Sequence, residues 1–324
     1  SNTTASNNTA MGTASLYSNT TGTNNIALGM NSLRSNTTAS NNTAVGYQAG
    51  NAITTGNFNT ALGSRSLEAT NTGTENTASG FRALLTNTTG SLNVAYGSGA
   101  LQLNTTGSNN SGFGKDALYS NTTASNNVAI GYQAGYSNTT GTQQVAIGRQ
   151  AMYSTTTGSQ NTAVGQRALY DNSTGQYNVA LGYAALENNT TANENTAVGY
   201  QSAYSNTTGI RNVSLGKGAG YNTTTSNDNT SVGTVALFSN TTGATNTALG
   251  AFSLYSNTTA SSNTAVGYQA LYDNTTGQNN TIVGRSAGAN LTTANNNTFI
   301  GKGAGETVTT GAKNTIVGLF NGNQ

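Results

Sequence analysis

The sequence of 324 residues contains no proline, cysteine, histidine or tryptophan, and only 6% of its residues are charged. Without cysteine and histidine there is no Ser-His triad, no cysteine nucleophile and no zinc site of the usual ligand types. Without cysteine there is also no disulfide framework. No run of about 18 apolar residues occurs, so the sequence predicts no membrane-spanning helix. We therefore expect a protein without catalytic activity, cofactor or metal.

The charges that are present are nearly balanced and widely dispersed. Eleven Lys and Arg stand against nine Asp and Glu, which gives a net charge of +2. This is not the clustered basic surface of a nucleic-acid-binding protein, and we expect no nucleic-acid partner. The nine carboxylates do not cluster as a calcium loop or an acid–base pair would need, and we interpret them as solvated surface charge.

The low content of both charged and hydrophobic residues leaves two classes of chain. One is a disordered low-complexity chain, and the other is a repeat protein with a thin core. Disordered chains usually combine low hydrophobicity with high net charge or abundant proline, and both are missing here. Periodicity must therefore decide between the two.

A glycine that follows Thr-Ala-Val, or a close variant of it, recurs every 17 residues from Gly12 to Gly318. The 19 repeats fill the chain without an insertion or deletion. A disordered tract has no physical reason to keep such a register, whereas one slip in a stacked fold would misalign a whole coil. Because 17 residues cannot hold two helices and a turn, and Thr, Asn and Gly are poor helix formers, the repeat predicts an all-β solenoid.

Positions are counted from this glycine, which is position 0. Position −4 is Asn in 18 of the 19 repeats, position −2 is nearly always Ala, and position −8 is Thr in all 19. Position −1 is mostly Val, Leu or Ile, and position +5 is often aromatic. Stacked coils place like on like, so we expect structural ladders along the solenoid. These ladders include Gly12, Gly29, Gly46, Gly131 and Gly267, Asn8, Asn25, Asn42, Asn127 and Asn263, and Tyr119, Tyr136, Tyr153 and Tyr170.

Each coil is expected to contain two short strands. Positions −4 to −1 form one strand and positions +1 to +5 form the other, with the glycine permitting a sharp corner between them. The segment resembling Asn-Thr-Thr-Gly supplies turn chemistry. The predicted fold class is an all-β parallel β-solenoid, or β-roll, with 19 coils of 17 residues in one uninterrupted array over residues 1–324.

The distribution of charge and volume predicts which side chains point inward. All 20 charged residues lie at positions −5, +1, +2, +5 or +6, so the remaining positions are candidates for the interior or for interfaces. In the last three repeats Ile282, Phe299 and Ile316 replace Ala at −2 while position +4 becomes Gly, as volume conservation in one core would require. If −2 and +4 share the core, strand alternation turns the −1 row outward, where it calls for a partner chain. The alternative keeps −1 inside and leaves Ala at −2 on the surface.

The segments 126–131 (Asn-Asn-Val-Ala-Ile-Gly) and 263–267 (Asn-Thr-Ala-Val-Gly) resemble the Asn-Ser-Val-Ala-Ile-Gly repeat in the heads of trimeric autotransporter adhesins. Similar repeats occur in phage tail fibres and other bacterial surface fibres, and the resemblance extends over the whole chain. It implies a left-handed β-roll, three chains around one axis and an extracellular adhesive or spacer role. The repeat here is longer than in that family, with the extra residues in the Asn-Thr-Thr-Gly turn.

The first hypothesis is an extracellular structural fibre or adhesin shaft, located on a cell surface, in a secreted filament or in a virion fibre. We expect self-association as a homotrimer or an end-to-end filament, and a host-surface or carbohydrate ligand that contacts the exposed tyrosine stripe. The sequence shows no stalk, membrane anchor or capping repeat, and Ser1-Asn2-Thr3-Thr4 contains no leader region, so we expect an excerpt of a longer fibre with its signal peptide absent or removed.

The second hypothesis is a fibril coated with covalent glycans. Asn-x-Ser/Thr sequons recur in the turn, and the unbroken Thr row at −8 offers sites for O-linked sugar. The alternative is that Asn and Thr are simply good turn and ladder residues, with the −8 hydroxyl buried and bonded to its neighbours. The candidate sites are Thr4, Thr21, Thr38, Thr89, Thr123, Thr140, Thr208 and Thr259, together with Asn19, Asn36, Asn121, Asn138, Asn206, Asn257 and Asn274.

A third hypothesis is an ice- or crystal-binding surface made from threonine rows. Such surfaces usually need two Thr at alternate positions on one strand face. The paired threonines here, such as Thr20-Thr21 and Thr139-Thr140, are adjacent, so in a strand they would point in opposite directions. Absence of thermal hysteresis would exclude this hypothesis.

Overall fold

The computed structural model describes residues 4–319, which form an all-β parallel β-solenoid with no helix. The predicted fold class is therefore confirmed. Every coil contributes one strand of three residues at positions −3 to −1. Within each unit, consecutive strands pair in parallel at equivalent positions, as Thr43 pairs with Thr60 and Ala44 with Ala61. The chain divides into two compact units, Ser1–Gln160 and Asn161–Gln324.

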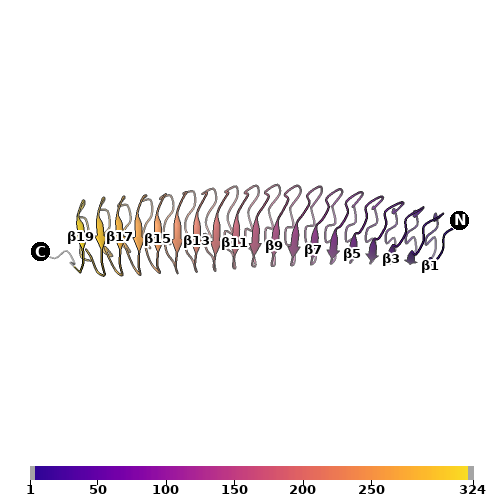
Figure 1. Ribbon diagram of the computed structural model, residues 1–324, viewed down its shortest axis with the longest axis horizontal. Coiled ribbons are helices and arrows are strands. Elements are labelled where there is room, and N and C mark those ends of the chain that lie inside the picture. The colour runs from indigo at the N-terminus through magenta and orange to yellow at the C-terminus, as the bar shows by residue number, and fades with distance from the viewer. Residues whose placement is uncertain (1–3, 320–324) are drawn as a thin grey trace. The chain divides into compact units, whose positions relative to one another are not determined.

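The strands appear in Figure 1 as a series of arrows labelled along the chain. The strands of the first unit are β1 (Thr9–Met11), β2 (Ile26–Leu28), β3 (Thr43–Val45), β4 (Thr60–Leu62), β5 (Thr77–Ser79), β6 (Val94–Tyr96), β7 (Ser111–Phe113), β8 (Val128–Ile130) and β9 (Val145–Ile147). The strands of the second unit are β10 (Thr162–Val164), β11 (Val179–Leu181), β12 (Thr196–Val198), β13 (Val213–Leu215), β14 (Thr230–Val232), β15 (Thr247–Leu249), β16 (Thr264–Val266), β17 (Thr281–Val283), β18 (Thr298–Ile300) and β19 (Thr315–Val317).

The prediction of a second strand at positions +1 to +5 is wrong, because this segment is a succession of turns. In the coil after Gly114, Asp116 and Leu118 have φ angles of 57° and 51°, so the chain leaves the extended geometry of a strand at positions +2 and +4. The segment still bonds to neighbouring coils, since the Asp116 N–H donates to the Ser98 carbonyl and the Leu118 N–H to the Ala134 carbonyl, both at 2.9 Å. Burying a leucine side chain contributes about 1.5–3 kcal/mol, which offsets a left-handed backbone cost of about 1–2 kcal/mol.

The glycine at position 0 forms the corner between the strand and these turns. Gly131 has a φ of +134°, a conformation that side-chain-bearing residues rarely adopt. A Cβ atom built on it would lie 2.7 Å from the backbone carbonyl carbon of Gly148 in the next coil. Both the backbone angle and the close approach of the next coil therefore require glycine here.

The hydrophobic core contains positions −2 and +4, as the charge and volume pattern predicts. Ala129 at −2 and Leu118 at +4 are fully buried, whereas Ile130 at −1 remains 41% exposed. The alternative that placed −1 inside and Ala at −2 on the surface is therefore wrong. Alternation along a three-residue strand can turn only its central side chain toward the core.

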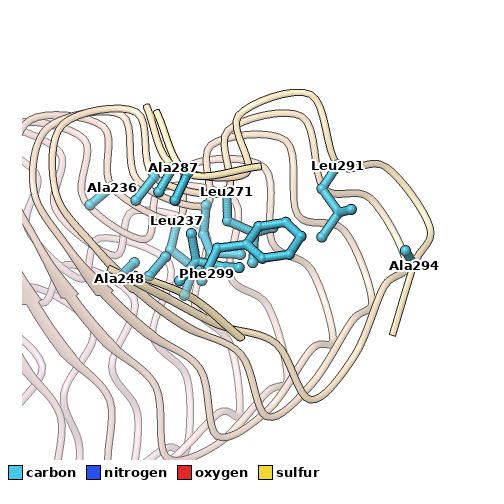
Figure 2. Packing of buried hydrophobic residues seen from close by; sticks show 13 residues of the cluster. Ala236, Leu237, Ala248, Leu271, Ala287, Leu291, Ala294 and Phe299 are labelled. Carbon is cyan, nitrogen blue, oxygen red and sulfur yellow. The ribbon is translucent and has the colours of Figure 1, made fainter. Parts of the chain in front are cut away.

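The exchange of volume between positions −2 and +4 is visible near the C-terminal end of the second unit. Phe299 is fully buried at −2, and a Cβ atom on Gly305, at +4 of the same coil, would lie 2.5 Å from its ring. Figure 2 shows this ring within the buried cluster, where Leu271 and Leu291 also project. Leu291 occupies a position that is Asn in most coils, so apolar packing extends further into these coils.

Candidate functional surfaces

Each unit contains a column of buried asparagine side chains at position −4. The Asn110 backbone N–H donates to Asn93 Oδ1 at 3.0 Å, and Asn110 Nδ2 donates to the Ala124 carbonyl at 2.9 Å. In turn the Asn127 N–H donates to Asn110 Oδ1 at 3.1 Å. The predicted ladder residues at −4 lie in this column, namely Asn8, Asn25, Asn42, Asn127 and Asn263. A buried amide costs stability unless it is paired, and here both ends of the amide are used.

A second column of buried amides occupies position −10, where the sequence suggested turn residues and sequons. Asn121 Nδ2 donates to Asn104 Oδ1 at 2.7 Å and to the Ala124 carbonyl at 3.0 Å. The same Ala124 carbonyl accepts from Asn110 of the −4 column. Where both positions are Asn, the two columns therefore meet at one shared carbonyl, as at Ala124. Residues such as Ile53, Thr155 and Leu291 interrupt the −10 column. The sequence analysis missed this network because it interpreted the −10 asparagines as turn residues and sequons.

The burial of the −10 asparagines determines whether the folded coil has room for an N-linked sugar. All seven candidate asparagines are at most 1% exposed, and these are Asn19, Asn36, Asn121, Asn138, Asn206, Asn257 and Asn274. An N-linked glycan is attached to Nδ2, which in Asn121 already donates two hydrogen bonds inside the coil. A sugar at these atoms is incompatible with the packed coil.

The threonine row at −8 has the opposite environment. Its threonine is exposed in all 19 repeats, and no −8 hydroxyl forms a hydrogen bond within residues 4–319. The eight candidate threonines all belong to this row, namely Thr4, Thr21, Thr38, Thr89, Thr123, Thr140, Thr208 and Thr259. The neighbouring −9 hydroxyl bonds to the next coil instead, as Thr122 Oγ1 does to the Thr139 carbonyl at 3.0 Å. The −8 hydroxyl is therefore not the buried ladder group that one interpretation proposed.

The aromatic residues at +5 stack on one another along each unit. Tyr136 stacks on Tyr119 at 5.2 Å and on Tyr153 at 5.1 Å between ring centroids, with interplanar angles of 11° and 7°. Partial burial raises the pKa of Tyr136, and the neighbouring tyrosine hydroxyls add to the effect. Tyr170, in the second unit, lies under the guanidinium of Arg167. Because both faces of Tyr136 are covered, its ring cannot stack on a sugar.

One acidic residue departs from the expected solvated surface charge. Glu187, at +5, is only 5% exposed, and its Oε1 lies 2.5 Å from Nη2 of Arg167. The Arg167 guanidinium also lies 4.3 Å from the Tyr170 ring centroid. Burial raises the pKa of Glu187, and Arg167 opposes that rise. Asp171 follows the same pattern, with its pKa raised by burial and lowered in part by Arg167.

The raised pKa of Glu187 predicts a pH-dependent stability of the second unit. A carboxyl whose pKa is higher in the folded state binds its proton more tightly there, so the unfolding free energy falls as pH rises from its ordinary value of 4.5 through the raised value. Glu187→Gln should flatten this decline, whereas Glu306→Gln, at an exposed +5 position, should leave it unchanged. Urea midpoints measured between about pH 4 and 8 provide the check. Parallel slopes in wild type and Glu187→Gln would contradict it.

A shallow hollow of about 350 Å³ interrupts the +5 row in the first unit. It is lined by Asn51, Ala52, Leu85 and the ion pair Arg65–Glu68, in which Arg65 Nε lies 2.5 Å from Glu68 Oε2. The pKa of Arg65 is raised by this hydrogen bond. Within residues 4–319, no group of three or more acidic side chains is placed to hold a metal ion.

Most exposed large apolar side chains of the described residues lie beside the position-0 glycine. Of the 23 such residues, ten are at position −1 and eight are at position +1. The −1 side chains point outward from the strand, and Tyr or Phe often occupies +1. The surface on both sides of the glycine corner is therefore the most apolar part of the exterior.

Comparison with protein-family models gives no match, and no curated protein matches the sequence. No helix within residues 4–319 is long and apolar enough to cross a membrane. Function is therefore inferred from the interior and the surfaces of the coil.

Proposed function

We propose that this protein is an extracellular structural fibre or adhesin shaft without catalytic activity. The observation that carries the proposal is the interior of the coil, in which backbone and asparagine hydrogen bonds link each coil to its neighbours. The −4 asparagines also bond to their equivalents 17 residues away. Such a coil is completed by its neighbours and extends by addition of further coils. A regular stack of this kind is suited to spacing or display, and the hollow beside Arg65 and Glu68 is shallow, unlike the deep clefts in which substrates usually bind.

The outward row at −1 and the resemblance to adhesin head repeats support self-association and a role at a surface. An apolar row is normally covered in a functional assembly. A homotrimer around one axis and an end-to-end filament are the two assemblies proposed, and both would serve a shaft on a cell surface, in a secreted filament or in a virion fibre.

Small-angle X-ray scattering with in-line light scattering tests the proposal on the full chain. We expect the strongly skewed distance distribution of an elongated particle, with a globular protein of similar mass as the reference. Light scattering then gives the mass, which is 32.7 kDa for one chain and three times that for a homotrimer. A symmetric, globular distance distribution would refute the fibre proposal.

A second candidate is an O-glycosylated fibril, favoured by the exposed hydroxyl row at −8. In this proposal the threonines carry the sugar and the buried asparagines at −10 carry none. Intact mass spectrometry of the native protein should exceed 32.7 kDa, and peptide mapping should place the excess on −8 threonines. An unmodified mass, or sugar on Asn121, would refute it.

A further inference from the structure

The cations of this protein are not distributed at random around the coil. Positions +1 and +2 carry eight of the 11 Lys and Arg but only one of the nine Asp and Glu. The eight cations are Arg65, Arg82, Lys115, Arg149, Arg167, Lys217, Arg285 and Lys302, and the single anion is Asp116. The small net charge of the chain hides this asymmetry, because most anions lie at positions −5, +5 and +6.

In the first unit these cations alternate with exposed aromatic rings. We define the cationic–aromatic edge as Phe81, Arg82, Lys115, Tyr132 and Arg149. Phe81 is 48% and Tyr132 41% exposed. The Arg82 guanidinium lies 4.8 Å from the Phe81 ring centroid, and Lys115 Nζ lies 6.0 Å from that of Tyr132.

Lys115 and Arg149 are available to a ligand. Both side chains are exposed, and neither forms a salt bridge within residues 4–319. They lie two coils apart, about 10 Å at the usual spacing of strands, with Tyr132 in the coil between them. On the other side of the glycine corner, Phe113 and Ile130 provide exposed apolar surface next to the cations.

The charges on this edge argue against covering it with identical edges of other copies. In a parallel homotrimer centred on the edge, three Lys115 ammonium groups would meet at one level and three Arg149 groups at another. Asp116, at +2, is the one anion beside the Lys115 level, whereas no anion stands beside Arg149 at +1 or +2 of its coil. Burying unpaired cations is costly. An occupant that carries negative charge removes this penalty.

We propose that the cationic–aromatic edge binds an anionic polysaccharide through its carboxylate or sulfate groups. Lys and Arg pair strongly with such groups, and the exposed rings and aliphatic side chains offer apolar contacts to sugar. One cation per two coils is far below the phosphate density of nucleic acid, about one charge per 1.7 Å of duplex. This inference rests on the proposed role as a surface fibre. It replaces +5 tyrosines within a stack, such as Tyr136 with both faces covered, as the carbohydrate contact.

The test measures binding of the full chain to heparin, polygalacturonate, dextran and oligo(dT) at several salt concentrations. We expect binding to at least one of the two anionic polysaccharides, weakening with salt, and none to dextran. The variant Lys115→Gln/Arg149→Gln should bind about tenfold more weakly, since two charged contacts are lost. The control variant Arg34→Gln/Lys313→Gln removes the same charge from exposed positions off the edge and should change affinity less than about twofold.

A second variant tests the aromatic contribution separately. Tyr132→Ser introduces the residue that Ser64 and Ser98 already provide at this position, so the coil should fold, as circular dichroism would show. It should weaken binding even at high salt. Equal losses in the edge and control variants, tighter binding to oligo(dT), or a homotrimer that buries the edge would each overturn the proposal. The scattering profile of the same sample reports independently on the fibre proposal.

Discussion

Gly131→Ala is expected to lower the free energy of unfolding by about 4 kcal/mol, enough to leave the neighbouring coils unfolded at moderate temperature. The φ of +134° at this position is strained for any residue with a side chain. The new Cβ atom would also lie 2.7 Å from the backbone of Gly148, so two adjacent coils would have to separate. The unfolding midpoint in urea, followed by circular dichroism, measures the effect.

A matched control distinguishes this effect from a general sensitivity to losing glycine. Gly135 has a φ of +61°, and at the same position of another coil Ala203 adopts a φ of 49°. Gly135→Ala should therefore lower the unfolding free energy by only about 1–2 kcal/mol, the usual cost of a left-handed backbone for a residue with a side chain. Its Cβ atom would meet the flexible end of Leu118 at 3.0 Å rather than the backbone of the next coil. Comparable losses in the two variants would show that the position-0 conformation is not the cause.

Asn110→Ala is expected to destabilise the first unit by about 3 kcal/mol. The substitution leaves the buried Asn127 N–H without its acceptor and removes one donor from the Ala124 carbonyl. An unpaired buried donor costs about 1–3 kcal/mol, and the cavity left by the side chain adds to that. Thermal and urea unfolding of the variant provide the measurement.

The control for this prediction is Thr123→Ala in the exposed −8 row. The Thr123 side chain is exposed and its hydroxyl forms no hydrogen bond within residues 4–319, so the change should stay within about 0.5 kcal/mol. If Asn110→Ala were as mild as Thr123→Ala, the amide columns would not be a main source of stability.

The candidate surfaces were only partly predictable. The row at −8 stands out in the sequence because it never varies, yet its exposure follows from the path of the turn. Glu187 shares position +5 with the exposed Glu306 but is buried. Arg167 of the preceding coil forms an ion pair with Glu187, and its guanidinium also lies over the Tyr170 ring. A rule based on position alone does not capture such neighbours.

The sequence by itself determined the stacking period and the all-β class, and it favoured a core at positions −2 and +4 over one that includes −1. A 17-residue register without slips admits only stacked coils. The absence of charge at −2 and +4, and the exchange of volume between them in the last repeats, favoured these positions for the core. These properties depend on periodicity and on the cost of burying charge, and both can be assessed from the order of the residues alone.

Only the tertiary structure decided the path between the strands and the fate of the asparagines at −10. Leucine at +4 gives no local signal for a left-handed backbone, and it adopts one because the next coil offers both a core site and a hydrogen-bond acceptor. Likewise, the sequence predicts Asn121 as a turn residue, and only the stacked structure shows that its side chain bonds to Asn104 of the neighbouring coil. Both features depend on contacts between coils, and the energy of such contacts exists only once the chain has stacked.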